Sequence, residues 1–339
     1  MNSMTKRIIG LALTITLGFV MVRLFTASTN ETKIEEQVAS NFQEDYKVYA
    51  LPTPKSLDFA GEKVPLNLID VKEKVDRELL VNTYWQSQTM LFLKRSNRWF
   101  PVIERILKDE GVPEDFKYLA LIESGFEQVV SPAGATGFWQ LMKAAASEND
   151  LEVSNGIDER YHVEKSTKAA CAYLKTAKEK FGNWTLAAAS YNMGMAGLQK
   201  QLDRQQATNY YDLVLNEETS RYLFRILAAK TILSDPSRFG FTFRESDLYP
   251  PLHYSEVEVS ETIDDLAVFA FENQINYKAL KYLNPWLRDN FLPNSSGKTY
   301  SIKIPTKPLS EVLVNDKAQV ATFTREKSDE RDQKGAAEE

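Results

Sequence analysis

The chain has 339 residues, of which 43% are hydrophobic and 26% charged, a composition that leaves room for one sizeable folded core and a smaller module. Its formal net charge of −6, with no cluster of Lys and Arg, argues against nucleic acid as the main ligand. The single cysteine, Cys171, excludes an intrachain disulfide. With His162 and His253 as the only histidines, a histidine-based metal site has little support, and we expect neither a metal nor a cofactor.

The first residues have the pattern of a targeting segment. Lys6 and Arg7 precede an apolar run over residues 8–22. Basic residues followed by such a run are typical of a secretory signal or of an uncleaved anchor. We therefore assign residues 1–27 to a signal peptide or N-terminal membrane anchor and expect an exported protein.

Residues 28–70 are polar and contain three prolines, which predicts a spacer with little regular structure. Residues 71–248 repeat apolar side chains at helical spacing, and no segment alternates as a strand would. This pattern predicts an all-α domain around a single core. The helices that we expect there are 75–96, 99–108, one that holds Glu123, 138–147, 163–181, one from 184 to 191 and beyond, and 218–233.

The pattern changes after residue 251. Residues 254–259 and 300–304 alternate as strands, and two short helices are expected between them, the second over 277–283. Residues 252–307 are therefore expected to form a small βααβ module. Residues 309–339 are charged with few apolar side chains, which is typical of a disordered tail.

The segment from Tyr118 to Phe126 contains one side chain that is charged near neutral pH, the carboxylate of Glu123. Helical spacing places this carboxylate on the same stripe as Phe116 and Leu119, and Gly125 is typical of a residue just past a helix end. Burial and the negative end of a helix both raise the pKa of a carboxyl. Glu123 is therefore a candidate general acid, the alternative being a structural glutamate paired with a Lys or Arg.

A glycine-bearing loop at residues 131–142 leads into a predicted helix. Trp139 offers a face on which a sugar could stack, Gln140 can both donate and accept hydrogen bonds, and Met142 follows at the helix start. The alternative for Trp139 is an ordinary place in the core.

Two further segments accompany these. Residues 157–161 form a mixed-charge group that includes Asp158. Residues 187–194 pair the phenol of Tyr191 with the amide of Asn192 at a predicted helix end.

Taken together, in this order and spacing, the segments Glu-Ser-Gly-Phe, Gly-Ala-x-Gly-x-Trp-Gln and Ala-x-Tyr-Asn-x-Gly resemble the three signatures of the soluble lytic transglycosylase family. The resemblance extends over residues 75–238 and is greatest to the membrane-bound lytic murein transglycosylase D subgroup. It implies a goose-lysozyme-like all-α catalytic domain at residues 71–248.

The resemblance further implies cleavage of the β-1,4 bond between N-acetylmuramic acid and N-acetylglucosamine in peptidoglycan. Glu123 would protonate the leaving oxygen and then, as a carboxylate, take the proton of the C6 hydroxyl that closes a 1,6-anhydro ring. Tyr191 would hydrogen-bond this glutamate. The substrate-binding residues expected on this basis are Ser124, Trp139, Gln140, Met142, Tyr191 and Asn192.

The C-terminal module resembles a lysin motif, a LysM-like unit that binds glycans containing N-acetylglucosamine. Its framework residues Leu280 and Asn284 match, but the usual Gly-Asp-Thr-Leu turn is replaced by residues 260–263. The alternative to glycan binding is a small module that packs on the enzyme.

Three functions remain open from the sequence. The first is a lytic transglycosylase in the periplasm or at the membrane, acting on peptidoglycan glycan strands as a monomer. The second is a lysozyme-type muramidase, in which Glu127 or Asp158 positions water. For Asp158 the simpler interpretation is an ion-paired brace. The third is a catalytically silent peptidoglycan-binding scaffold.

Overall fold

The structure is a computed structural model that describes residues 48–307. The expected signal segment or anchor (1–27), part of the spacer and the expected tail (309–339) lie outside the described residues. Pro52 and the described residues after it belong to one compact unit. Within 48–307, no helix combines the length and apolarity needed to cross a membrane.

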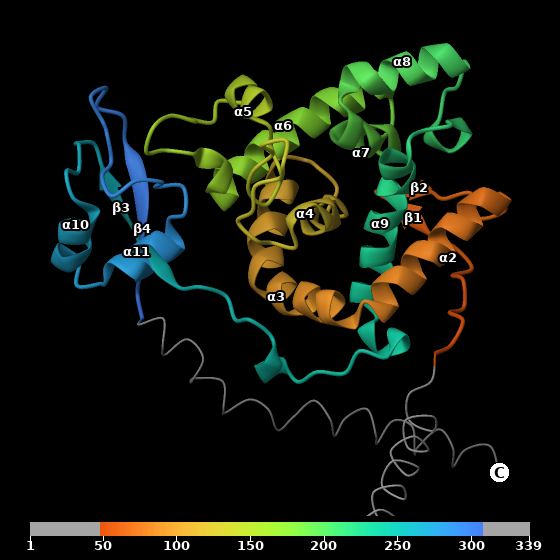
Figure 1. Ribbon diagram of the computed structural model, residues 1–339, viewed down its shortest axis with the longest axis horizontal. Helices are drawn as coiled ribbons and strands as arrows, with labels where there is room; N and C mark the ends of the chain where they lie inside the picture. The colour runs from red at the N-terminus through yellow and green to blue at the C-terminus, as the bar shows by residue number, and fades with distance from the viewer. Residues whose placement is uncertain (1–47, 308–339) are drawn as a thin grey trace, which may run out of the picture. The chain divides into compact units, whose positions relative to one another are not determined.

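The first part of the described chain is helical (Figure 1), with short 3₁₀ turns between the α-helices. The α-helices are α2 (Ile69–Tyr84), α3 (Gln86–Asp109), α4 (Phe116–Ser124), α5 (Lys143–Glu148), α6 (Val163–Phe181), α7 (Trp184–Met193), α8 (Met195–Gln205) and α9 (Glu217–Ser234). The 3₁₀ turns are η1 (Glu159–Tyr161), η2 (Tyr210–Asp212), η3 (Pro236–Phe239) and η4 (Glu245–Asp247). The mainly α fold class predicted from the sequence is confirmed.

Helix α4 packs against both α3 and α9 (Figure 1). Every residue from Phe116 to Ile122 is buried, because apolar side chains occupy nearly all of these positions. The exception is Lys117, whose ammonium group pairs with Glu104 at 2.6 Å. Side chains of this helix become partly exposed only at its C-terminal end, at Glu123 and Ser124.

The predicted break between helices 75–96 and 99–108 is wrong. Helix α3 runs unbroken through this region and even contains Pro101, whereas the chain breaks earlier, at Trp85. Helix α2 packs on α9 while α3 packs on α6 and α4, so the chain must change direction between them. Tertiary packing, rather than local propensity, places this break.

The predicted helix over 138–147 is also shorter than expected. Only Lys143–Glu148 are α-helical, because Thr136 and Leu141 exchange backbone hydrogen bonds of 3.1 Å and hold the residues between them in a turn. The glycine-bearing loop is therefore closed on itself before α5 begins.

The spacer predicted over 28–70 is not free of regular structure in its described part. Strands β1 (Asp58–Phe59) and β2 (Glu62–Lys63) form a hairpin. Phe59 is fully buried and meets Phe116 edge-on, with 5.2 Å between ring centroids. The Glu62 carboxylate accepts hydrogen bonds from the backbone N–H groups of Trp184 and Thr185 at 2.6 and 2.9 Å, which caps the start of α7. The hairpin is thus part of the helical domain.

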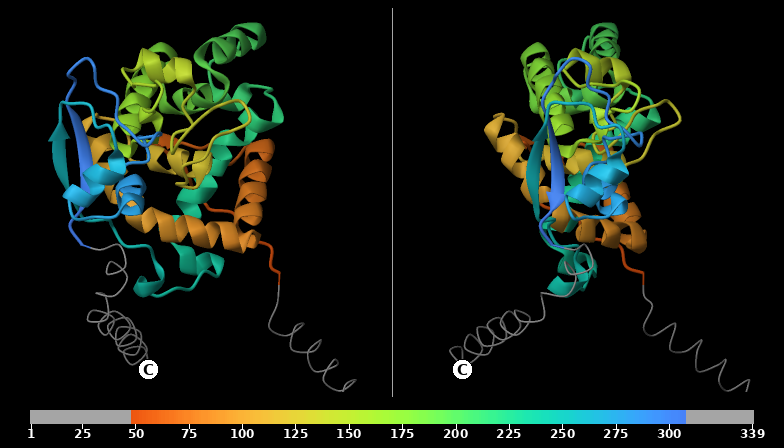
Figure 2. Two further views of the ribbon diagram at one scale, coloured as in Figure 1. Left: turned by 60° about the vertical axis from the view of Figure 1, so that its left-hand side comes forward. Right: turned by 90° about the vertical axis from the view of Figure 1, so that its left-hand side faces the viewer.

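The predicted βααβ module is present. Strands β3 (Tyr254–Val259) and β4 (Tyr300–Pro305) pair antiparallel, and helices α10 (Leu266–Glu272) and α11 (Tyr277–Leu283) connect them. Both helices lie on one face of the two-stranded sheet (Figure 2).

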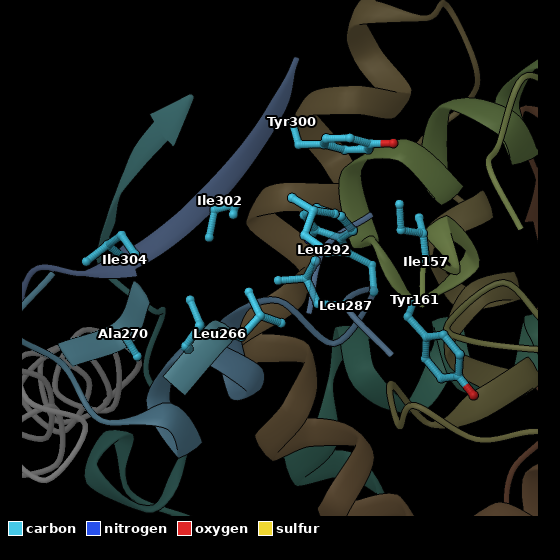
Figure 3. Packing of buried hydrophobic residues seen from close by; sticks show 11 residues of the cluster. Ile157, Tyr161, Leu266, Ala270, Leu287, Leu292, Tyr300, Ile302 and Ile304 are labelled. Atoms are coloured by element: carbon cyan, nitrogen blue, oxygen red, sulfur yellow. The ribbon is translucent and has the colours of Figure 1, made fainter. Parts of the chain in front are cut away.

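The module shares a hydrophobic core with the helical domain. Figure 3 shows Ile157 and Tyr161, from the segment before α6, beside buried side chains of the module such as Leu287. The backbones also meet, because Asp158 N donates to the carbonyl of Trp286 at 2.9 Å. Such contacts make the module an integral part of this domain rather than a tethered unit.

Polar contacts reinforce this junction. Lys303 of β4 pairs with Glu164 of α6 at 2.5 Å, and Lys298 pairs with Glu152 at 2.8 Å. The Lys303–Glu164 pair is shielded from solvent, so salt screens it less than it would a surface pair.

We expect Leu287→Ala to lower the free energy of unfolding by about 2–4 kcal/mol, because the change leaves a cavity in the shared core. Urea denaturation of the purified protein measures this change. Val268→Ala, at a position that is 53% exposed, is the control and should change stability by less than about 0.5 kcal/mol. A loss of similar size in both variants would contradict a shared core.

Candidate active site

Glu123 lines a cavity of about 650 Å³. The cavity is bounded by the junction of α2 and α3, the C-terminal end of α4 and the first turns of α9. The site is therefore assembled from segments far apart in the sequence, and α4 provides Glu123.

The end of α4 is held in place by two arginines. Arg95 of α3 donates to the carbonyl of Gly125 at 3.1 Å, and Arg225 of α9 donates to the carbonyl of Ile122 at 3.0 Å. These bonds satisfy carbonyls that have no partner within the helix. Gly125 has a φ of 60°, and a Cβ there would lie 3.1 Å from the ring of Phe92, so glycine allows α3 to approach. The prediction that Gly125 ends the helix is confirmed.

The hydroxyl of Tyr222 in α9 donates a short hydrogen bond to Oε1 of Glu123. Burial raises the pKa of the Glu123 carboxyl, and the nearby charge of Glu218 acts in the same direction. The Tyr222 hydrogen bond and the charge of Arg225 oppose this shift without cancelling it. Burial and the charge of Glu123 also raise the pKa of Tyr222 well above its usual value, so Tyr222 stays a neutral donor. The group expected to act as a general acid thus has the environment that favours its protonated form.

Other carboxylates line the same cavity. Glu78 is buried and paired with Arg221 at 2.7 Å, so its charge is balanced. Glu218 is exposed and accepts a hydrogen bond of 3.1 Å from the amide of Asn192. Glu218 is thus a neighbouring carboxylate whose charge raises the pKa of Glu123.

Tyr191 does not hydrogen-bond Glu123, contrary to the prediction. Its hydroxyl donates instead to the carbonyl of Trp139 at 2.7 Å, although it lies close enough for the charge of Glu123 to raise its pKa. The phenol that meets the glutamate is that of Tyr222. Tyr191 joins α7 to the loop before α5.

Trp139 does not present a sugar-stacking face. Its side chain is 0% exposed, and its indole N–H donates to the hydroxyl of Thr167 at 2.8 Å. The core alternative is therefore correct, because a buried indole needs an apolar environment and one hydrogen-bond acceptor, and α6 supplies both. The exposed tryptophan at the cavity is Trp85, which is 61% exposed at the turn between α2 and α3.

Gln140 and Ser124 both make hydrogen bonds within the chain. The Gln140 amide nitrogen donates to the carbonyls of Gly137 and Val129 at 2.8 and 3.1 Å. The Ser124 hydroxyl donates to the carbonyl of Phe138 at 2.9 Å and also faces the cavity. Ser124 thus ties the end of α4 to the glycine-bearing loop and borders the cavity, whereas Gln140 closes the loop on itself and on Val129.

The remaining candidates, Met142 and Asn192, do not border the cavity at Glu123. Met142 is the residue before α5, is exposed, and is not among the residues that border the cavity. Asn192 orients Glu218 through its amide nitrogen and accepts a hydrogen bond of 2.7 Å from the Thr219 hydroxyl. Asn192 therefore acts on the site through Glu218.

The sequence suggested Glu127 or Asp158 as a second carboxylate, and both side chains form ion pairs away from Glu123. Glu127 forms an ion pair with Arg95 outside the cavity. Asp158 is buried and paired with Arg160 at 2.7 Å, which confirms the expected brace. Gly137 packs against this brace so closely that a Cβ would lie 2.2 Å from the Arg160 carbonyl oxygen.

Three residues of the site were not predicted from the sequence: Tyr222, Trp85 and Glu218. Tyr222 falls on the buried stripe of α9, where its pattern is that of a core aromatic. Trp85 lies inside the apolar spacing that predicted one continuous helix. Glu218 stands at the start of α9, where an acid is ordinary for helix-dipole reasons. No local signal separates these residues from structural ones.

Comparisons with known proteins agree with this geometry. Residues 100–214 match the family described as Transglycosylase SLT domain, and residues 255–308 match Soluble lytic transglycosylase C-terminal LysM-like domain. Tyr222 and Arg225 lie beyond the first match, so part of the site falls outside the segment that defines the family.

Similar curated proteins include "Membrane-bound lytic murein transglycosylase D" from Escherichia coli strain K12, which is 26% identical over 261 residues. The protein of the same name from Escherichia coli O6:H1 gives the same values. In both cases the match covers 74% of this chain and 55% of the relative, so this chain spans about half the length of these relatives.

A "Putative tributyltin chloride resistance protein" from Alteromonas sp. strain M-1 is 29% identical over 113 residues, covering 33% of this chain and 55% of that protein. The chain therefore contains a transglycosylase SLT domain and a LysM-like domain of the soluble lytic transglycosylase C-terminal type, and it is similar to membrane-bound lytic murein transglycosylase D.

Proposed function

We propose that this protein is a peptidoglycan lytic transglycosylase that cleaves the β-1,4 bond between N-acetylmuramic acid and N-acetylglucosamine. The observation that carries the proposal is the Glu123 carboxyl, which has a raised pKa, a hydrogen bond from Tyr222 and access to the cavity. The match to the transglycosylase SLT domain and the similarity to membrane-bound lytic murein transglycosylase D support the substrate class.

In the first step, protonated Glu123 donates its proton to the glycosidic oxygen as the bond to C1 of the muramic sugar breaks. Burial favours this step because it destabilises the carboxylate relative to the acid. The departing group leaves as an alcohol, and the muramic sugar carries the developing positive charge at C1.

In the second step, the Glu123 carboxylate takes the proton of the C6 hydroxyl, whose oxygen attacks C1 and closes the 1,6-anhydro ring. Glu123 thus returns to its protonated form, and no water is consumed. Tyr222 stabilises the carboxylate between the two steps through a hydrogen bond to a charged acceptor.

Glu218 supports a second candidate function. It lines the same cavity and its charge acts on Glu123, so it could orient water for a lysozyme-type hydrolysis. Against this, Glu218 is exposed and already accepts a hydrogen bond from Asn192. We therefore prefer the reaction with a single carboxylate.

We propose further that the protein acts in the bacterial cell envelope on glycan strands. The basic and apolar N-terminal segment and the name of the membrane-bound relatives support this location.

We expect Glu123→Gln to abolish release of soluble muropeptides from purified sacculi, with a loss of at least about a thousandfold, because no other group supplies the proton. Sedimentation with sacculi should show that binding persists. Mass spectrometry of the wild-type products should give anhydro-muropeptides, lighter by one water than reducing-end products. Appreciable turnover by the variant would exclude Glu123 as the acid.

Tyr222→Phe removes a hydrogen bond that favours the Glu123 carboxylate, so the pKa of Glu123 rises further. Since the acid form is required, kcat/KM falls as pH rises through this pKa, and the variant's alkaline limb should move to higher pH. Its maximal rate should fall about tenfold because the carboxylate loses its donor.

The matched control is Tyr191→Phe, which removes the same hydroxyl group from a tyrosine that donates to Trp139 instead. The position of its alkaline limb should not change. A larger shift for Tyr191→Phe than for Tyr222→Phe would reverse the roles of the two phenols.

Glu218→Gln separates the two candidate functions. In the lytic reaction the variant still forms anhydro products, and its alkaline limb moves to lower pH because a charge that raises the pKa of Glu123 is gone. Product analysis by mass spectrometry, together with the pH profile, tests both points. Reducing-end products from the wild type, lost in Glu218→Gln, would instead favour hydrolysis.

A further inference from the structure

A second and larger cavity, of about 810 Å³, lies between the helical domain and the C-terminal module. Its walls come from the C-terminal half of α3, the start of α6, the segment before β3 and the α11 region. Nothing in the reaction proposed at Glu123 uses this cavity.

The cavity is rich in cations that lack acidic partners. Arg98, Arg105 and Lys281 line it, and none of them pairs with a carboxylate within residues 48–307. Arg98 donates to the carbonyl of Pro250 and Lys281 to the carbonyls of Leu287 and Asp289, which leaves the guanidinium of Arg105 as the group best placed to meet a ligand. The sole acid in the lining, Glu164, is already engaged by Lys303 at 2.5 Å. In a chain whose net charge is −6, this concentration of unpaired positive charge favours an anionic ligand.

Within the described part of the chain, three buried polar atoms of lining residues also lack hydrogen-bond partners: the Trp286 indole nitrogen, the Gln128 amide oxygen and Oε2 of Glu164, which lies 3.2 Å from Nδ1 of His162. Trp286 is 2% exposed, so water at the surface does not satisfy its N–H. The lining residues thus hold one unpartnered donor and two unpartnered acceptors besides the cations, a set that can meet both the carboxylate oxygens and the amide N–H groups of one molecule.

Helix α3 connects the two cavities. Gln88 and Phe92 border the cavity at Glu123, and Arg95 and Trp99 border the second one. From Phe92 to Trp99 the helix rises about 10 Å. Three residues of an extended peptide span about the same length. The two cavities are therefore close enough for an extended ligand to reach from one to the other.

We propose that the cavity between the helical domain and the C-terminal module binds the carboxylate-bearing peptide stem of a glycan strand whose sugars lie at Glu123. The proposal rests on the proposed function for the identity of the strand. Arg105 faces the stem carboxylates, while Trp286 donates to a carbonyl or carboxylate oxygen and Gln128 accepts from a peptide N–H. The protein therefore prefers peptide-bearing strands to bare ones.

The first test measures binding without catalysis. Stem peptides released from sacculi by an amidase are titrated into the full-length protein by calorimetry. We expect binding by the wild type, a loss of about tenfold or more in affinity for Arg105→Glu, and an intermediate loss for Arg105→Gln. Arg105 is exposed, so these changes leave the core intact.

Trp286→Phe keeps the aromatic ring and removes only the unpartnered N–H, so it should weaken binding several-fold. The control is Arg204→Glu on α8, an exposed position away from both cavities that undergoes the same change of charge. No binding by the wild type, or equal losses for Arg105→Glu and Arg204→Glu, would overturn the proposal.

The second test uses turnover. The ratio of KM for amidase-stripped strands to KM for peptide-bearing strands should exceed one for the wild type and fall about tenfold in Arg105→Glu, with no change in Arg204→Glu. If the wild type forms anhydro products with a ratio of one, the peptide site is wrong and the proposed function stands. If peptide binds but no anhydro products form, the proposed function fails instead.

Discussion

The hydrogen bond from Tyr222 to Glu123 is the constraint on which the rest of the site depends. It joins α9 to the end of α4, and Arg225, one turn further along α9, holds the carbonyl of Ile122. Any movement of α9 away from α4 would remove both contacts together. The carboxyl would then keep its burial on one side but lose the donor that stabilises its charged form. Packing of α9 on α4 is therefore part of the chemistry as well as of the fold.

Features set by nearby residues could be predicted from the sequence. The bounds of α6 at Val163–Phe181, the helix end at Gly125 and the strand at Tyr254–Val259 follow from spacing and turn residues. Burial of the helix that carries Glu123 follows in the same way. Each of these depends on interactions within a few residues, where helical or strand periodicity carries the information.

Features set by distant partners could not be predicted. Tyr191 and Tyr222 both lie on helices facing the interior, and their hydroxyl partners are fixed by how α7 and α9 pack. Trp139 is a core residue because Thr167 of α6 accepts its N–H. The turn at Trp85, which exposes that side chain to the cavity, arises because α2 and α3 pack on different helices. Periodicity identifies a buried stripe and does not say which buried polar atom meets which.

The two adjacent cavities differ in the charged residues that line them. Glu78, Glu217 and Glu218 line the one at Glu123, and the charge of Glu218 helps to keep Glu123 protonated. The one beside the C-terminal module is lined by Arg98, Arg105 and Lys281, which have no acidic partner within the described residues. A cavity walled by two domains keeps its shape only if the domains are fixed to each other, since a flexible tether would let the walls separate. The backbone bond from Asp158 to Trp286 and the shared core around Leu287 provide that fixation. In this protein the lysin-motif-like module is therefore best understood as one wall of a binding site, because the contacts that dock it are the ones that form the cavity.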